Sequence, residues 1–186
     1  MRTLGYAVLS LLSREDLSGY DLKRWMERPL GYFWSARHSQ IYPELARLEE
    51  EGYVTHRVVE QQERPDKKVY GITDSGRELL RAWITEPPVE RPAREELVLK
   101  AYSVWLAEPG AAAALFREQE VRHEEQLRQY EEIEGWMKEK WGGEPEQMDF
   151  HHFASYAALR RGIGFERDSA AWCRWMTAEL EERQSG

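Results

Sequence analysis

One stretch, residues 37–80, limits what this chain can fold into more than any other. It opens with a polar start at Ser39 and an apolar periodicity that runs to Gly52, a pattern that predicts a helix with a glycine stop. Two runs of β-forming residues follow, 53–59 and 68–73, separated by a polar, Pro-containing tip. A recognition helix with a β-wing has this layout, and it contacts DNA in the major groove and along the backbone. We therefore expect a winged helix-turn-helix domain that binds DNA.

Three more helices complete this predicted domain. Residues 2–13 carry apolar side chains at helical spacing. A second helix is expected to start at Ser18, because Asp21 three residues later makes a variant of the capping box, and to end near Pro29. Thr73 begins the fourth helix, directly after the wing.

The composition changes at residues 86–96, where three prolines stand among charged residues. Such a segment is typical of a linker or a rigid elbow. We therefore divide the chain into a winged helix-turn-helix domain (1–85), the linker, and a helical dimerisation and effector domain (97–186). The fold class expected is mostly α with a small β-wing.

Beyond the linker the pattern is helical throughout. We expect one helix over about 94–107, a long one over about 110–141, and a last one over about 147–184 that is interrupted at Gly162 and Gly164. On the long helix four side chains recur every seven residues, which indicates a partial heptad seam. They are Phe116, His123, Tyr130 and Met137, with Leu127 and Trp141 on the companion positions. Because this apolar surface exceeds what one such domain easily buries, we predict a homodimer formed by these helices.

The net charge argues against DNA binding, but the distribution of the charges weakens that argument. The net charge is −8, with 26 Lys and Arg against 34 Asp and Glu. Residues 1–85 hold 13 of each sign, so all the excess acid lies in the C-terminal part. A neutral DNA-binding domain must make its positive potential locally. A winged-helix protein-interaction module without DNA binding therefore stays open as the alternative.

The compartment is expected to be the cytoplasm. The single cysteine, Cys173, excludes an intrachain disulfide and fits a reducing environment. The apolar stretch at the N-terminus is too short to span a membrane and has no signal-peptide cleavage site. We expect no membrane partner.

Three segments resemble the PadR family of bacterial transcriptional regulators. They are LSGYDLKR (17–24), FWSARHSQIYPELARLEEEGYV (33–54) and KKVYGITDSGRELL (67–80). The long helical C-terminal part is similar to that of the larger-subtype members. The resemblance implies a homodimer, usually a repressor, that binds a palindromic operator in double-stranded DNA. For some members it also implies release by a small molecule such as a phenolic acid or a drug.

The resemblance assigns three residues to the front of the recognition helix: Ser39, Gln40 and Tyr42. A glutamine can contact adenine with two hydrogen bonds, and a serine can contact a base or a phosphate. The alternative is a helix cap followed by solvated polar side chains. Tyr20 and Lys23, on the preceding helix, would contact backbone phosphate, although Tyr20 also suits a core position.

The wing carries three cations, Arg64, Lys67 and Lys68. Wing cations contact phosphate or enter the minor groove. A solvated turn is the alternative, because the acidic Glu63 and Asp66 are interspersed with them.

Tryptophan is abundant in the C-terminal part. A flat aromatic effector could stack between such side chains, although aromatic residues at helical spacing more often form core or dimer interface. The candidate effector residues are Trp105, Trp136, Trp172 and Trp175.

No metal, cofactor or catalytic residue is expected. His151 and His152 are adjacent, and adjacent residues on a helix point roughly 100° apart, so we expect no joint chelation, and no third ligand stands at metal-binding spacing. No phosphate-binding loop, nucleophile elbow or Cys–His pair can be recognised. We therefore expect no enzyme activity.

Overall fold

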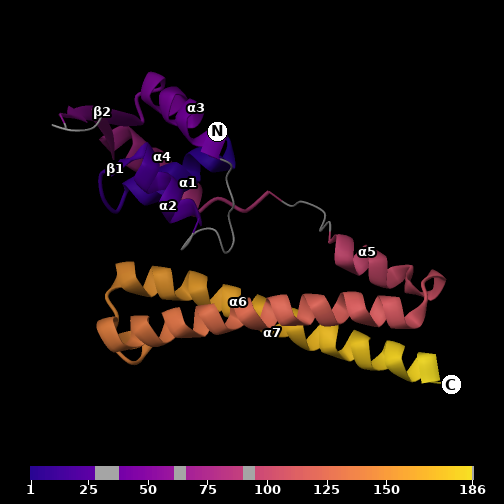
Figure 1. Ribbon diagram of the computed structural model, residues 1–186. Coiled ribbons are helices and arrows are strands. Elements are labelled where there is room, and N and C mark those ends of the chain that lie inside the picture. Colours follow the sequence, from indigo (N-terminus) through magenta and orange to yellow (C-terminus); the bar gives the residue numbers. More distant parts are fainter. Residues whose placement is uncertain (28–37, 61–65, 90–94, 186) are drawn as a thin grey trace. The chain divides into compact units, whose positions relative to one another are not determined.

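The computed structural model describes residues 1–27, 38–60, 66–89 and 95–185. Two compact units make up the chain, Met1–Glu90 and Arg91–Gly186, and each is described by itself. Figure 1 shows the first as a small mixed unit and the second as long helices.

In the described part of the first unit, four helices combine with a three-stranded antiparallel sheet. The strands lie in the order β1–β3–β2, so β3 is the central strand. In its pairing with β2, Tyr70 of β3 lies opposite His56 of β2. This arrangement confirms the winged helix-turn-helix fold, with β2 and β3 as the wing. The elements are α1 (Thr3–Leu12), β1 (Leu17–Ser18), α2 (Gly19–Glu27), α3 (His38–Glu50), β2 (Val54–Val59), β3 (Lys67–Ile72) and α4 (Asp74–Ile84).

One apolar core joins the helices of this unit to the sheet. Helix α3 contributes side chains that are at most 1% exposed, because its apolar positions recur at helical spacing. Tyr6 of α1 stacks on Trp83 of α4, with ring centroids 4.3 Å apart. The fully buried side chains of this core include Val8, Leu9, Leu12, Leu22, Ile41, Leu45 and Leu48.

Short-range signals set two of the element boundaries as expected. Gly52 adopts φ +76° and ends α3, and the N–H groups of Gly52 and Tyr53 donate to the carbonyls of Glu49 and Leu48. This is a Schellman motif. At the start of α4 the hydroxyl of Thr73 accepts a hydrogen bond from the Gly76 N–H at 3.1 Å.

The predicted start of α3 is wrong. His38 and Ser39 are both helical, so Ser39 is not the N-cap. Helix α3 therefore begins before the position that the polar residue Ser39 suggests. The residues that precede His38 lie outside the described part of the chain. The predicted end of α2 at Pro29 also lies outside it.

The second unit is a long helical hairpin with a short helix at its start. Its elements are α5 (Glu96–Tyr102), a 3₁₀ turn η1 (Val104–Leu106), α6 (Pro109–Trp141), a second 3₁₀ turn η2 (Pro145–Gln147) and α7 (Phe150–Ser185). The helix expected over 94–107 is thus divided in two at Ser103. Helix α6 has 33 residues and α7 has 36, and the two pack along their length (Figure 1).

Helix α7 continues through Gly162 and Gly164, so the predicted interruption is wrong. Gly162 lies under the ring of Tyr130, where an added Cβ would come within 3.1 Å of a ring carbon. The small residue therefore permits close packing of α7 on α6.

The heptad side chains of α6 are used within the chain. Phe116 and Tyr130 are at most 2% exposed, and His123 pairs with Glu166 of α7 through its Nδ1 at 2.5 Å. The expectation that this seam forms the dimer interface is wrong for Phe116 and Tyr130, because α7 of the same chain covers them. Apolar surface elsewhere on this unit stays exposed.

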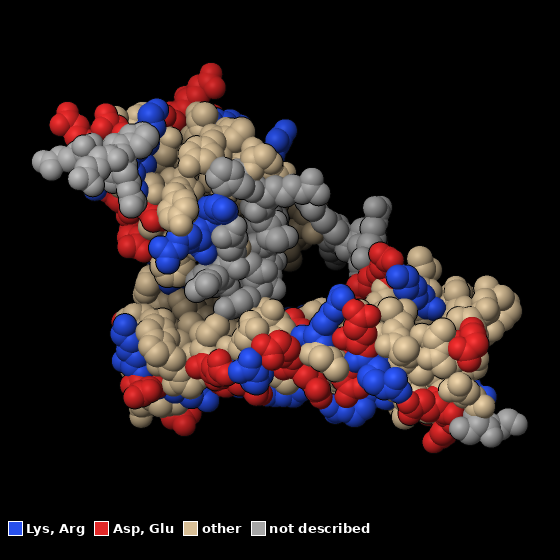
Figure 2. All heavy atoms as spheres, in the orientation of Figure 1, with Lys and Arg blue, Asp and Glu red and all other residues tan. Residues whose placement is uncertain are grey.

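Ion pairs line the sides of the hairpin. Glu134 of α6 accepts from Arg160 of α7 at 3.0 Å, and Glu131 accepts from Arg167 at 2.9 Å. Partners nearer the start of α6 lie nearer the end of α7, as an antiparallel pair requires. In Figure 2, blue and red side chains accordingly alternate over these helices. Among the described residues, no helix has the length and apolar character needed to cross a membrane.

Candidate nucleic-acid interface

The outer face of α3 carries the predicted base-reading residues. Ser39, Gln40 and Tyr42 are exposed, while Ile41 and Leu45 between and beyond them are buried in the core. The helical period thus separates a packing face from a polar face. The polar face is exposed, as the winged-helix interpretation requires.

Tyr42 also connects α3 to the start of α2. Its ring lies so close to Gly19 that a Cβ at that position would be 2.5 Å from a ring carbon. Tyr42 is still 46% exposed. One side of the ring therefore packs on the glycine, and this contact sets how closely the two helices approach.

The start of α2 is a reciprocal capping box. Asp21 N–H donates to the Ser18 hydroxyl at 3.2 Å, and Ser18 N–H and its hydroxyl both donate to the Asp21 carboxylate. These bonds confirm the expected cap. The hydrogen bond from the Ser18 side chain, with further help from Lys67, holds the pKa of Asp21 below its ordinary value.

Tyr20 and Lys23, the two residues of α2 predicted to contact phosphate, differ in exposure. Tyr20 is 61% exposed, so the structure excludes the alternative of a core position. Lys23 is half-buried.

The predicted wing cations have different surroundings. Lys67 reaches back to Asp21, with its ammonium 2.9 Å from a carboxylate oxygen. Lys68 is exposed on β3. Arg64 lies outside the described residues.

Arg57 is a wing cation that the sequence analysis did not single out. It lies on β2 opposite Val69, and its side chain is 65% exposed. A carboxylate oxygen of Asp16 is 4.0 Å away. The strand period could have found it, because Arg57 lies two positions from the exposed Thr55 and so shares its face.

The acidic end of α3 is tied to its own neighbours. A carboxylate oxygen of Glu49 lies 2.5 Å from Nδ1 of His56 on β2. A carboxylate oxygen of Glu51 forms an ion pair with the guanidinium of Arg47, also at 2.5 Å. Arg47 also pairs with Glu44, and these bonds raise the pKa of the arginine. The Glu49–His56 contact joins the recognition helix to the wing.

Comparison with known proteins identifies the family. Residues 8–82 match the Transcriptional regulator PadR-like family, and residues 93–181 match the Virulence activator alpha C-term family. The Negative transcriptional regulator PadR of Bacillus subtilis is 35% identical over 98% of this chain and 100% of its own length. The chain belongs to the PadR-like family. It is therefore a transcriptional regulator with the larger subtype's C-terminal helices.

Solved structures of Bacillus subtilis PadR support the fold in detail. Its complex with operator DNA is 33% identical, covers 97% of this chain and 98% of its own, and has a TM-score of 0.84. Its complex with p-coumaric acid is also 33% identical, with 97% and 96% coverage and a TM-score of 0.76. The likeness extends over both units of this PadR-like chain.

The four predicted effector residues of this family member are not gathered in one place. Trp172 contacts Phe116 edge to face, at 5.6 Å between centroids. Trp136 instead contacts Trp141 near the α6–α7 turn, at 5.1 Å. Because 20 residues of α6 separate Phe116 from Trp136, the two groups are about 30 Å apart at 1.5 Å per residue. One small ligand cannot contact both.

The candidate tryptophans also differ in how exposed they are. Trp175 is 55% exposed and Trp105 of η1 is 78% exposed, whereas Trp172 packs against a small core that α5, α6 and α7 share. The end of the hairpin that holds Phe116 thus presents both a packed and an open indole.

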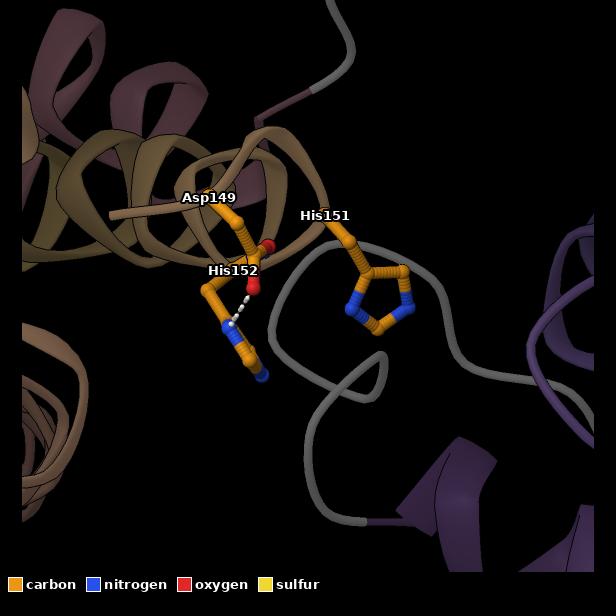
Figure 3. A group of neighbouring side chains, drawn as sticks. All are labelled: Asp149, His151 and His152. Atoms are coloured by element: carbon orange, nitrogen blue, oxygen red, sulfur yellow. Dashed lines mark hydrogen bonds and ion pairs between the residues drawn. The ribbon is translucent and has the colours of Figure 1, made fainter.

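The sequence analysis expected no joint metal chelation by His151 and His152, because adjacent residues on a helix point in different directions. The structure does not support that argument at the start of α7. Ligand atoms of Asp149, His151 and His152 all lie within 4.8 Å of one another (Figure 3). The two imidazoles point in different directions, but the ring of His152 turns back toward Asp149. Asp149 thus provides a third potential metal ligand, which the sequence spacing did not reveal.

Proposed function

We propose that this regulator binds a palindromic operator in double-stranded DNA as a homodimer and represses transcription. Helix α3 enters the major groove with Ser39, Gln40 and Tyr42 toward the bases. Tyr20 and Lys23 of α2, and the wing cations Arg57, Arg64 and Lys68, contact phosphate. The observation that carries the proposal is the exposed polar face of α3 beside the wing, in a chain similar over its whole length to a protein solved on operator DNA.

Roles follow from side-chain chemistry. Gln40 can pair with an adenine edge through two hydrogen bonds. Lys68, Arg64 and Arg57 are fixed positive charges that neutralise phosphates without reading sequence. This local set of cations supplies the attraction that the neutral net charge of residues 1–85 does not.

The test is a competition assay with randomised half-sites. Gln40→Ala should relax the preference at one position per half-site, by about 1–3 kcal/mol. Lys68→Ala should weaken binding about equally for all sequences and reduce the salt slope by about one. Unchanged base preferences for Gln40→Ala would remove Gln40 from base reading.

The same assay separates this function from the alternative of a protein-interaction module. A DNA-binding protein loses affinity steeply as salt rises, because it releases counterions from the phosphates. A module that has lost DNA binding would show no such slope with any fragment.

We place the dimer contact on exposed apolar side chains of the second unit. Leu99 of α5 is 66% exposed and Trp105 and Leu106 of η1 are 78% and 72% exposed. Exposed apolar side chains of this kind mark interaction sites where they gather in one patch. Leu99→Glu combined with Leu106→Glu should convert the dimer to a 22.0 kDa monomer in sedimentation, and an unchanged dimer would move the interface elsewhere.

We also propose release by a small aromatic effector that stacks at the Trp172 end of the hairpin. Support comes from the Bacillus subtilis relative, whose structure was solved with p-coumaric acid, and from the open indole of Trp175. An effector alters operator affinity only through unequal binding to two arrangements of the dimer. Trp175→Ala should therefore weaken operator release by p-coumaric acid while leaving operator affinity in its absence unchanged.

A further inference from the structure

The first turn of α7 brings together three groups that bind metals. Asp149 precedes the helix, and His151 and His152 are its second and third residues. Their ligand atoms lie within 4.8 Å of one another, and Figure 3 shows the carboxylate and both imidazoles on one side of the helix start. They belong to the second unit and have no part in the proposed DNA interface.

Neighbouring contacts hold two of these groups in place. Asp149 caps the helix, accepting from the His152 N–H at 2.9 Å, and its other oxygen is 2.6 Å from His152 Nδ1. The His152 ring stacks on Trp141 of α6, with 4.2 Å between centroids and 21° between planes. Packing and capping thus hold the carboxylate and the imidazole beside one another, and their two ligand atoms would separate from 2.6 Å to about 3.4 Å to share one ion.

We propose that Asp149, His151 and His152 bind one divalent transition-metal ion of the zinc class, with a fourth position open to water or an external ligand. Two imidazole nitrogens and one carboxylate oxygen are a known ligand set for such ions. Ligands about 2.0–2.2 Å from one ion lie at most about 4 Å apart, so only a small rotation is needed. His151 is exposed, and its ring is the one that would rotate.

The charge of Asp149 suits this role. The His152 N–H donates to the Asp149 carboxylate and holds its pKa below the ordinary value, so the ligand is anionic at neutral pH.

The test uses the full chain and Co²⁺, whose visible absorption reports its ligands, followed by displacement with Zn²⁺. We expect one ion per chain. Asp149→Asn, His151→Ala and His152→Phe should each weaken binding by at least about tenfold, since loss of a ligand costs more than loss of an outer partner. Quenching of Trp141 fluorescence by Co²⁺ would locate the ion beside His152.

The variants keep the helix start intact. Asn caps a helix as well as Asp, and Phe retains the stack on Trp141. Asp168→Asn, an exposed carboxylate on the same helix, is the matched control and should leave affinity unchanged. The proposal is overturned if Co²⁺ does not bind, if Asp149→Asn binds like the parent, or if only His151→Ala weakens binding, which is the behaviour of a single surface histidine.

Discussion

The carboxylate of Asp21 lies 2.9 Å from the ammonium of Lys67, joining the cap of α2 to the first residue of β3. The same carboxylate accepts the Ser18 hydroxyl at 2.6 Å. One acidic side chain therefore orients both the helix start and a wing cation, on the surface proposed to face DNA. It also neutralises that cation.

Replacing Asp21 should strengthen DNA binding. Asp21→Asn keeps a capping side chain but removes the negative charge, so that Lys67 becomes available to phosphate. We expect higher affinity for all sequences alike and a salt slope steeper by about one. Fluorescence anisotropy across a salt series measures both quantities.

A matched control is Asp74→Asn, which removes a carboxylate from the first turn of α4. It should change the salt slope less than Asp21→Asn does. Equal slopes in the two variants would mean that general charge, and not the release of Lys67, controls affinity.

The contact between Gly19 and Tyr42 predicts a coupled pair of substitutions. Gly19→Ala would place a Cβ 2.5 Å from a Tyr42 ring carbon, so the ring must move out of its position on α3. Operator affinity should fall. In a Tyr42→Ala background the obstacle is gone, and Gly19→Ala should then have little further effect.

This double-mutant cycle measures the coupling directly. Contacting residues show coupling of about 0.5–3 kcal/mol, whereas independent residues add. Additive losses in affinity would show that Gly19 acts on DNA binding without Tyr42.

Local signals account for the features that the sequence analysis predicted correctly. The cap at Ser18, the stop at Gly52 and the cap at Thr73 each depend on hydrogen bonds between residues at most five positions apart. Such patterns can be read directly in the sequence. The wing strands were also found, because β-forming residues concentrate there.

Features that depend on distant partners were not predicted. Lys67 looks like a free wing cation until Asp21 is placed beside it. Gly162 looks like a helix breaker until the ring of Tyr130 is seen to cover it. Periodicity located the seam of α6 but could not say whether the same chain or a second copy covers it.

The glycines of α7 provide a test of hairpin packing. Gly162→Val should destabilise the protein by about 1–3 kcal/mol, because the added methyl groups overlap the Tyr130 ring. Gly164 has nothing within 4 Å of an added Cβ, so Gly164→Ala should stabilise by about 0.5–1 kcal/mol through helix propensity. Urea denaturation measures both, and similar effects at the two positions would contradict the packing described.

Acid should weaken the hairpin through Glu134. Its side chain is only 13% exposed, and this burial alone would raise its pKa. The hydrogen bonds from Arg160 and Tyr156, both 3.0 Å long, outweigh burial, and the pKa is lowered from its ordinary value of 4.5. A carboxyl with a lowered pKa stabilises the folded state fully above its unfolded value, and the contribution is lost as the pH falls through the folded value.

Glu134→Gln should therefore cost about 1–3 kcal/mol of unfolding free energy at neutral pH, since it breaks charge-assisted hydrogen bonds. The gap between parent and variant should narrow as the pH drops below about 4.5. Denaturation between pH 7 and pH 3 measures this, with Glu139→Gln, an exposed position of the same helix, as the control. A gap that stays constant over the whole range would mean that Glu134 contributes by packing and not by its charge.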